Sequence, residues 1–132
     1  MPGMKTLIWI LQLFLGVYFL AVGILDFIVP DGLPDLMSWM YELSQGLHIF
    51  SGVAEILAGI GLLLPILVRP LRPLIPLAAL GLVVVMIGAV VWHATRGEAA
   101  SIINNLVMAV LAGVVAYGRW RLHPLDSSAP SS

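Results

Sequence analysis

The sequence has 132 residues, of which 61% are hydrophobic and only 10% are charged. A soluble domain carries about 25% charged residues, so this balance is typical of an integral membrane protein. The formal net charge of -1 excludes the broadly basic surface with which proteins bind nucleic acid. Because the chain contains no cysteine, disulfides, thiolate metal sites and dithiol redox chemistry are excluded as well.

Four apolar runs are long enough to cross a membrane, since a hydrocarbon core of about 30 Å requires roughly 20 helical residues at about 1.5 Å each. The runs lie at about residues 7–26, 46–66, 74–94 and 101–118. The first run is too long for a signal peptide and offers no small-residue cleavage site, so we expect it to be retained. The sequence therefore predicts an all-α, integral membrane four-helix bundle, with residues 1–123 as its single domain.

The basic residues indicate how the bundle is oriented. In a four-span topology, one side carries five of the six basic residues: Lys5, Arg69, Arg72, Arg119 and Arg121. The other side carries Arg96 and most of the acidic residues. Because basic residues concentrate in cytoplasmic loops, we expect both termini to be cytoplasmic, in the cytoplasmic (inner) membrane of a bacterium or archaeon. Residues 124–132 have the composition of a disordered tail.

The connections between the spans differ in kind. The prolines of VRPLRP end the second span and predict a tight turn before the third. Between the first two spans, residues 34–43 (PDLMSWMYEL) place apolar side chains at helical spacing, and Trp39 and Tyr41 suit the lipid headgroup region. We expect a short interfacial helix there. The sequence leaves open an alternative, in which this segment folds inward as a lid over the mouth of the bundle.

Small residues recur along the faces of the spans, a spacing that lets helix backbones approach closely in lipid. The predicted helix-packing positions are Gly16, Gly23, Gly52, Gly59, Gly81 and Gly88. On the fourth span, Asn105 is in line with Ala109, Ala112 and Ala116, which predicts that this face points inward.

One glutamate, Glu55, lies near the predicted bilayer centre, with no cation within a helical turn. An ionised carboxylate at that depth costs roughly 2.5 to 3.5 kcal/mol, so Glu55 should be protonated, paired or facing water. Its candidate partners in a ligand-binding or proton-relay cleft are Asp26, His48, His93 and Asn105. A second interpretation is that Glu55 is a protonated acid that only fixes helix register through one hydrogen bond.

The two histidines near the outer interface also have a simpler interpretation. His48 and His93 could each be solvated or face lipid headgroups, where a polar side chain costs little. The sequence contains no covalent haem motif and no closed set of metal ligands. We therefore expect no metal site and no covalently bound cofactor.

The order of these features resembles the DoxX-like family of small bacterial and archaeal membrane proteins. The resemblance covers residues 7–121 and rests on LFLGVYFLAVGILD, on SGVAEILAGIGLLLP with its G-x-x-E core, and on the closing AYGRWR. It implies a four-helix fold, with Glu55 as the family glutamate and Arg119 as the family's terminal arginine. Many members have a lysine where this chain has Asp26, so the resemblance does not imply a lysine–glutamate pair here.

The resemblance also suggests a function, because some members are related to subunits of thiosulfate:quinone oxidoreductases or are grouped with membrane oxidoreductase complexes. In the first hypothesis, a quinone or similar lipophilic molecule binds beside Glu55 and a histidine, and a redox partner protein supplies electrons. In the second, the bundle is non-catalytic. It would then bind lipid, form a homo-oligomer, or anchor another membrane protein. No nucleophile with its base is evident, so a self-contained enzyme is the weakest hypothesis.

Overall fold

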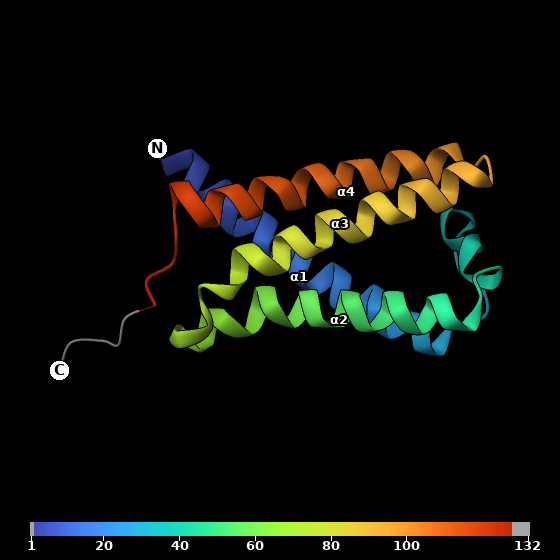
Figure 1. Ribbon diagram of the computed structural model, residues 1–132, viewed down its shortest axis with the longest axis horizontal. Helices are drawn as coiled ribbons and strands as arrows, with labels where there is room; N and C mark the ends of the chain where they lie inside the picture. The colour runs from blue at the N-terminus through green and yellow to red at the C-terminus, as the bar shows by residue number, and fades with distance from the viewer. Residues whose placement is uncertain (1, 128–132) are drawn as a thin grey trace.

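The computed structural model describes residues 2–127 (Figure 1). Its long helices are α1 (Pro2–Ile28), α2 (Gln45–Leu67), α3 (Leu74–Thr95) and α4 (Ala99–Tyr117). Its short helical segments are η1 (Asp35–Tyr41), η2 (Arg69–Leu71) and η3 (Gly118–Leu122). The part of the chain that the structure describes contains no β-strand.

The fold confirms the predicted four-helix membrane bundle. Each long helix is long and apolar enough to cross a bilayer. The predicted spans agree with the observed helices to within two residues at each end, except that α1 begins five residues before the predicted start. The protein is therefore a multi-pass integral membrane protein.

The bundle is built from two antiparallel helix pairs, α1 with α2 and α3 with α4, and α2 also packs against α3 (Figure 1). Figure 1 shows the start of α1 and η3 at one end of the bundle and η1 at the other. The buried core between the pairs includes Leu15, Phe19, Leu62, Leu82 and Ala112.

Helices α1 and α2 touch at their glycines. A Cβ atom on Gly59 would lie 2.9 Å from the carbonyl oxygen of Gly16, and one on Gly52 would lie 3.1 Å from the carbonyl oxygen of Gly23. These distances leave no room for a side chain, so the two backbones approach directly at two levels, as small residues allow in membranes. The four predicted glycines of α1 and α2 thus lie in one helix interface.

The glycines of α3 do not pack in this way. A Cβ atom on Gly81 or Gly88 would meet no atom within 4 Å, and both residues are exposed. The residues that α3 buries include Ile75, Ala79, Leu82 and Met86. The prediction that Gly81 and Gly88 are packing positions within the bundle was wrong. Because α3 is apolar on every side, glycine spacing alone does not identify its inward face.

The inward face of α4 includes Ala112, which is fully buried. Ala109 and Ala116 are half-buried and pack against the core. Asn105 is half-buried as well, one turn closer to the start of the helix. The stripe predicted to face inward therefore lies at the edge of the buried face, which also includes Met108 and Val115.

The segment after α1 folds over the mouth of the bundle. Helix α1 gives way to Val29, whose φ of 43° lies in the left-handed region and turns the chain. Helix α2 begins after Ser44, whose hydroxyl group caps its first turn. Between them, η1 buries Met40. We call residues 34–43 the lid, because the structure has the inward-folded arrangement that the sequence left open as an alternative.

The other end of the bundle is held by Arg72, which donates hydrogen bonds to two carbonyl groups in the last turn of α2. Its third bond, of 2.9 Å, goes to the carbonyl oxygen of Asp126, and Leu125 packs against the core. Residues 124–127 are thus attached to the bundle, which differs from the disorder predicted for the tail. The rest of that tail, residues 128–132, lies outside the described residues.

Candidate ligand cavity

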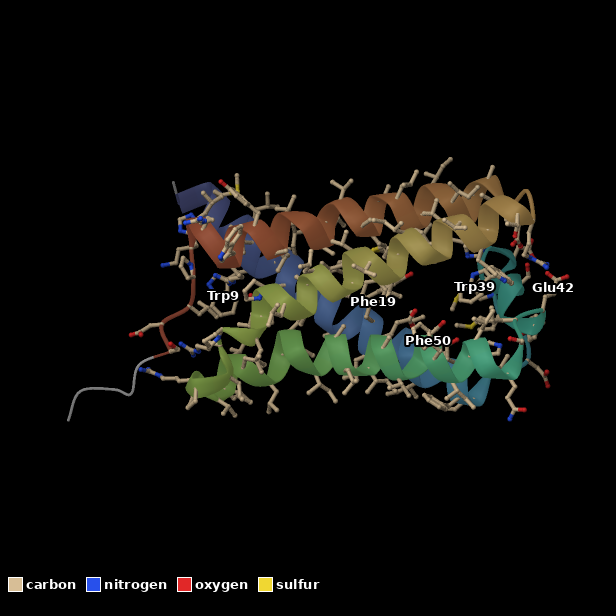
Figure 2. All side chains as sticks on the ribbon, in the orientation of Figure 1. Trp9, Phe19, Trp39, Glu42 and Phe50 are labelled. Atoms are coloured by element: carbon tan, nitrogen blue, oxygen red, sulfur yellow. The ribbon has the colours of Figure 1, made fainter. Side chains whose placement is uncertain are left out.

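A cavity of about 410 Å³ lies between the four helices beneath the lid. Ligand pockets generally measure about 300 to 1,000 Å³, so this space is large enough for a small molecule. Most of its wall is apolar, and the aromatic residues that line it are Tyr18, Phe19, Trp39, Phe50 and Trp92. Figure 2 labels Phe19, Trp39 and Phe50 among them.

The cavity opens sideways between α2 and α3. Phe50 of α2 and Val84 of α3 both line it, yet they are 70% and 64% exposed. Leu47, one turn before Phe50, also lines the cavity and is exposed. Since these apolar rim residues belong to membrane-spanning helices, a molecule dissolved in the bilayer can reach the cavity without passing through water.

Glu55 lies in the cavity wall and is only 5% exposed. It interacts with the carboxyl group of Asp26 on α1. Oε2 of Glu55 and Oδ2 of Asp26 are both buried, and neither has a hydrogen-bond partner among the described residues. Unbonded polar atoms are costly in an apolar interior, so a proton held between the two carboxyl groups would stabilise both.

Asp26 and His48 lie behind Glu55, outside the set of residues that line the cavity. His48 Nδ1 is 2.9 Å from Asp26 Oδ1, and the Asp26 side chain is fully buried. On the other side of the ring, His48 Nε2 is 2.7 Å from the carbonyl oxygen of Met40 in the lid. His48 is thus neither solvated nor directed at lipid headgroups. It connects the acidic pair to the lid.

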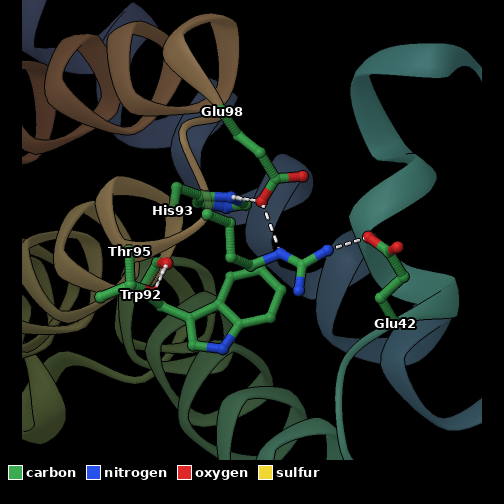
Figure 3. Close-up of polar contacts among 6 residues, drawn as sticks. Glu42, Trp92, His93, Thr95 and Glu98 are labelled. Atoms are coloured by element: carbon green, nitrogen blue, oxygen red, sulfur yellow. Dashed lines mark hydrogen bonds and ion pairs between the residues drawn. The ribbon is translucent and has the colours of Figure 1, made fainter.

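His93 lines the cavity where α3 ends, beneath the lid. Its Nδ1 is 3.1 Å from Glu98 Oε1, which also accepts a hydrogen bond of 2.9 Å from Arg96 Nε (Figure 3). Arg96 in turn bonds Glu42 of the lid, and Trp39 of the lid packs edge-on against the His93 ring, with 5.4 Å between centroids. Because Glu98 occupies Nδ1, Nε2 is the His93 nitrogen left for a ligand.

The charges beside His93 stabilise one another. Loss of solvent opposes ionisation of Glu98, but hydrogen bonds from His93 and Arg96 outweigh it and lower the pKa of Glu98 below its ordinary value. The hydrogen bond to Glu98 and the negative charge of Glu42 raise the pKa of Arg96. This end of the lid is therefore attached to the α3–α4 turn through charged groups.

Helix α4 contributes polar groups to the cavity beyond the predicted Asn105. Asn105 lines the cavity, as do Ser101 and Asn104. On α2, Ser51 joins them one turn before Glu55. The three α4 residues recur at positions i, i+3 and i+4, a spacing that places them on one helix face and could have revealed them.

Arg119 lies at the other end of the bundle and does not line the cavity. Its Nε donates a hydrogen bond of 2.6 Å to Gln12 Oε1, and Gln12 Nε2 donates one of 2.8 Å to the carbonyl oxygen of Leu62. The guanidinium group also lies over the Trp9 ring, 4.5 Å from its centroid. These contacts join α1, α2 and η3, so Arg119 has a structural role in the bundle.

Hydrogen-bonding groups therefore stand at separate points of an apolar cavity: Glu55 on α2, His93 on α3 and the polar face of α4. Within residues 2–127, no three histidine, aspartate or glutamate side chains are grouped closely enough to hold a metal ion. The donor set suits a largely apolar organic molecule with two or more polar atoms.

A family model described as the DoxX-like family matches residues 10–115, which is most of the chain. The protein belongs to the DoxX-like family. No curated protein and no solved structure matches it. Membership confirms the resemblance inferred from the sequence. The family alone does not identify the ligand of this DoxX-like protein, because function belongs to sites rather than to folds.

Proposed function

We propose that this DoxX-like protein binds a quinone or a similar lipophilic molecule in its cavity, as a subunit of a redox system in the cytoplasmic membrane of a bacterium or archaeon. The observation that carries the proposal is Glu55, a carboxyl group in the wall of a mostly apolar cavity that has an exposed apolar rim. A ligand that enters from lipid and needs a hydrogen bond at this depth fits both features.

The other polar and aromatic side chains of the cavity suit a ligand that has a planar ring with polar atoms attached to it. A protonated Glu55 can donate to one ring oxygen, and His93 Nε2 or the amide of Asn105 can bond another. Aromatic side chains such as Phe19 and Trp39 offer faces and edges against which a planar ring packs well. The bound quinone would exchange electrons with a redox partner protein, while the acidic groups take up or release its protons.

A non-catalytic role is the second candidate, in which the protein binds lipid or helps to assemble a membrane complex. Its supporting observation is the same cavity wall, because an acyl chain can fill an apolar space without any use of Glu55. Only the quinone-binding candidate requires the side chain of Glu55, so the experiment varies that residue.

The test measures what the purified protein retains. Protein from quinone-containing membranes is isolated in mild detergent and extracted with organic solvent, and quinone and phospholipid are quantified per chain. The parent should retain quinone, and Glu55→Leu, which removes every hydrogen-bonding atom of this side chain, should retain at least about tenfold less, as expected for loss of roughly 1.4 kcal/mol of binding free energy. Asp31→Leu, at an exposed position that does not line the cavity, is the matched control and should retain the parental amount. Retention of phospholipid alone by the parent would support the non-catalytic role.

A further inference from the structure

The hydrogen bonds of His48 determine how many protons it shares with Asp26. A carbonyl oxygen only accepts, so the Nε2 atom that faces the carbonyl group of Met40 must carry a hydrogen. The contact between Nδ1 and Asp26 Oδ1 needs one more proton between its two atoms. The pair is either a carboxylate with an imidazolium or a carboxylic acid with a neutral imidazole. In both forms it is neutral overall and holds two protons.

The pair cannot lose one of these protons and keep both bonds. A neutral imidazole beside an ionised Asp26 has a single N–H, which can serve only one partner. The Asp26 side chain is fully buried, and an unbonded carboxylate there is far costlier than an unbonded carbonyl group. The hydrogen therefore stays on Nδ1, and the bare Nε2 of His48 then repels the carbonyl oxygen of Met40.

We propose that Asp26 and His48 form a titratable latch, which holds the lid closed while the pair carries both protons and releases the lid when one proton leaves. The latch regulates access to the ligand cavity, so its biological purpose rests on the proposed function, whereas its mechanism needs no ligand. Since Glu55 interacts directly with Asp26, a ligand that exchanges a proton with Glu55 can alter the protonation of the latch.

Of the titratable groups on the lid, Asp35 is exposed, and the Tyr41 hydroxyl group donates a hydrogen bond to the carbonyl oxygen of Pro30. Glu42 and the charged groups that it faces form the second attachment of the lid. Glu42 bonds Arg96, and Arg96 and His93 both bond Glu98. The lowered pKa of Glu98 and the raised pKa of Arg96 keep that salt bridge intact at neutral pH. Two titratable groups on the helices lie close to the latch or to the lid. Glu55 interacts with Asp26 of the latch, and His93 contacts Trp39 of the lid, so the experiment includes a control variant at His93.

The experiment measures lid position against pH without any added quinone. Single cysteines replace Ser38, exposed on the lid, and Ile103, 62% exposed on α4, and both receive spin labels for a pulsed distance measurement. As the buffer is raised from about pH 6 to about pH 9, the open-to-closed ratio of the parent should rise, by at most about tenfold per pH unit for one proton. A parental distance that does not change over this range would overturn the latch.

Asp26→Asn is the decisive variant. Its amide can donate to Nδ1 of a neutral His48, whose Nε2–H still reaches the carbonyl group of Met40, so both bonds form with no shared proton to lose. The lid should then stay closed at every pH. A variant that titrates like the parent, or that is open throughout, would contradict the proposal. The control His93→Gln should keep the parental pH response.

A second measurement serves if Asp26→Asn does not fold. Nitrogen-15 chemical shifts of the labelled parent should place a proton on His48 Nε2 while the lid is closed, and on Nδ1 alone once the lid opens. Persistence of the Nε2 proton at high pH would refute the latch. Because neither measurement uses a ligand, failure of the latch is distinct from failure to retain quinone.

Discussion

At the residue scale, glycines with similar spacing have opposite surroundings. Gly59 meets the backbone of α1, whereas a Cβ atom on Gly81 of α3 meets nothing. The difference depends on the neighbouring helix, because spacing shows only that residues share a face. A pair of alanine substitutions can therefore separate helix packing from the intrinsic effect of glycine in a helix.

We expect Gly59→Ala to lower the free energy of unfolding by about 1 to 3 kcal/mol, since its new methyl group would lie 2.9 Å from the carbonyl oxygen of Gly16 and backbone cannot move aside as a side chain can. Gly81→Ala should be neutral or stabilise the helix by up to about 1 kcal/mol. Equilibrium unfolding in detergent micelles measures both. Equal losses in the two variants would show that α1 and α2 do not meet at Gly59.

At the element scale, the lid has two attachments of different chemistry. Met40 is tied through His48 to α1, and Glu42 is tied through Arg96 to the α3–α4 turn (Figure 3). The first attachment depends on a shared proton, whereas the second depends on fixed charges. The lid should therefore respond to acid and to base through different residues.

The acid response follows from Glu98. Its folded-state pKa lies below the ordinary value of 4.5, so its contribution to lid attachment is complete above pH 4.5 and is lost as the pH falls through the lower folded value. Trp39 and Trp92 pack beside His93, and their emission should change in that acidic range. In Glu98→Gln this acidic transition should be absent, and a transition identical to the parent's would assign it to another group.

The sequence predicts the helices better than it predicts the lid. Spans are predictable because each helix must satisfy its own backbone in lipid, which requires one long apolar run. The lid is different, since Trp39 and Tyr41 suit a membrane surface and a bundle mouth equally well. The lid folds inward because two of its residues contact side chains elsewhere in the fold. The carbonyl group of Met40 contacts His48 of α2, and Glu42 bonds Arg96, which is 54 residues away along the chain. The choice is made by tertiary contacts that no local pattern encodes.

The candidate site shows the same limit. Glu55 was predictable from its depth in the second span, because a carboxyl group at that depth is costly on any face of the helix. His48 and His93 were both predicted as cavity residues on similar grounds, but only His93 lines the cavity. Separating a ligand-facing histidine from one that holds the lid requires the positions of Asp26 and the lid carbonyl group, which helix periodicity does not supply.

At the scale of the whole molecule, the two ends of the bundle differ in charge. The end with the chain termini and the α2–α3 turn carries Lys5, Arg69 and Arg72. The lid end carries Asp31 and Glu42, with Arg96 as its basic residue. The positive-inside rule therefore still predicts that the termini are cytoplasmic and that the lid is on the outer side.

This orientation decides where protons from the latch would go. The chain has no cysteine, so Asp31→Cys and Arg69→Cys each introduce a single thiol, one at each end of the bundle. In intact cells, a membrane-impermeant thiol reagent that passes the outer envelope should label Asp31→Cys, and it should label Arg69→Cys only after the membrane is permeabilised. The reverse pattern would place the lid in the cytoplasm. Because the lid covers the latch and the cavity together, the labelled side is also the side on which protons shared by Asp26 and His48 would meet water.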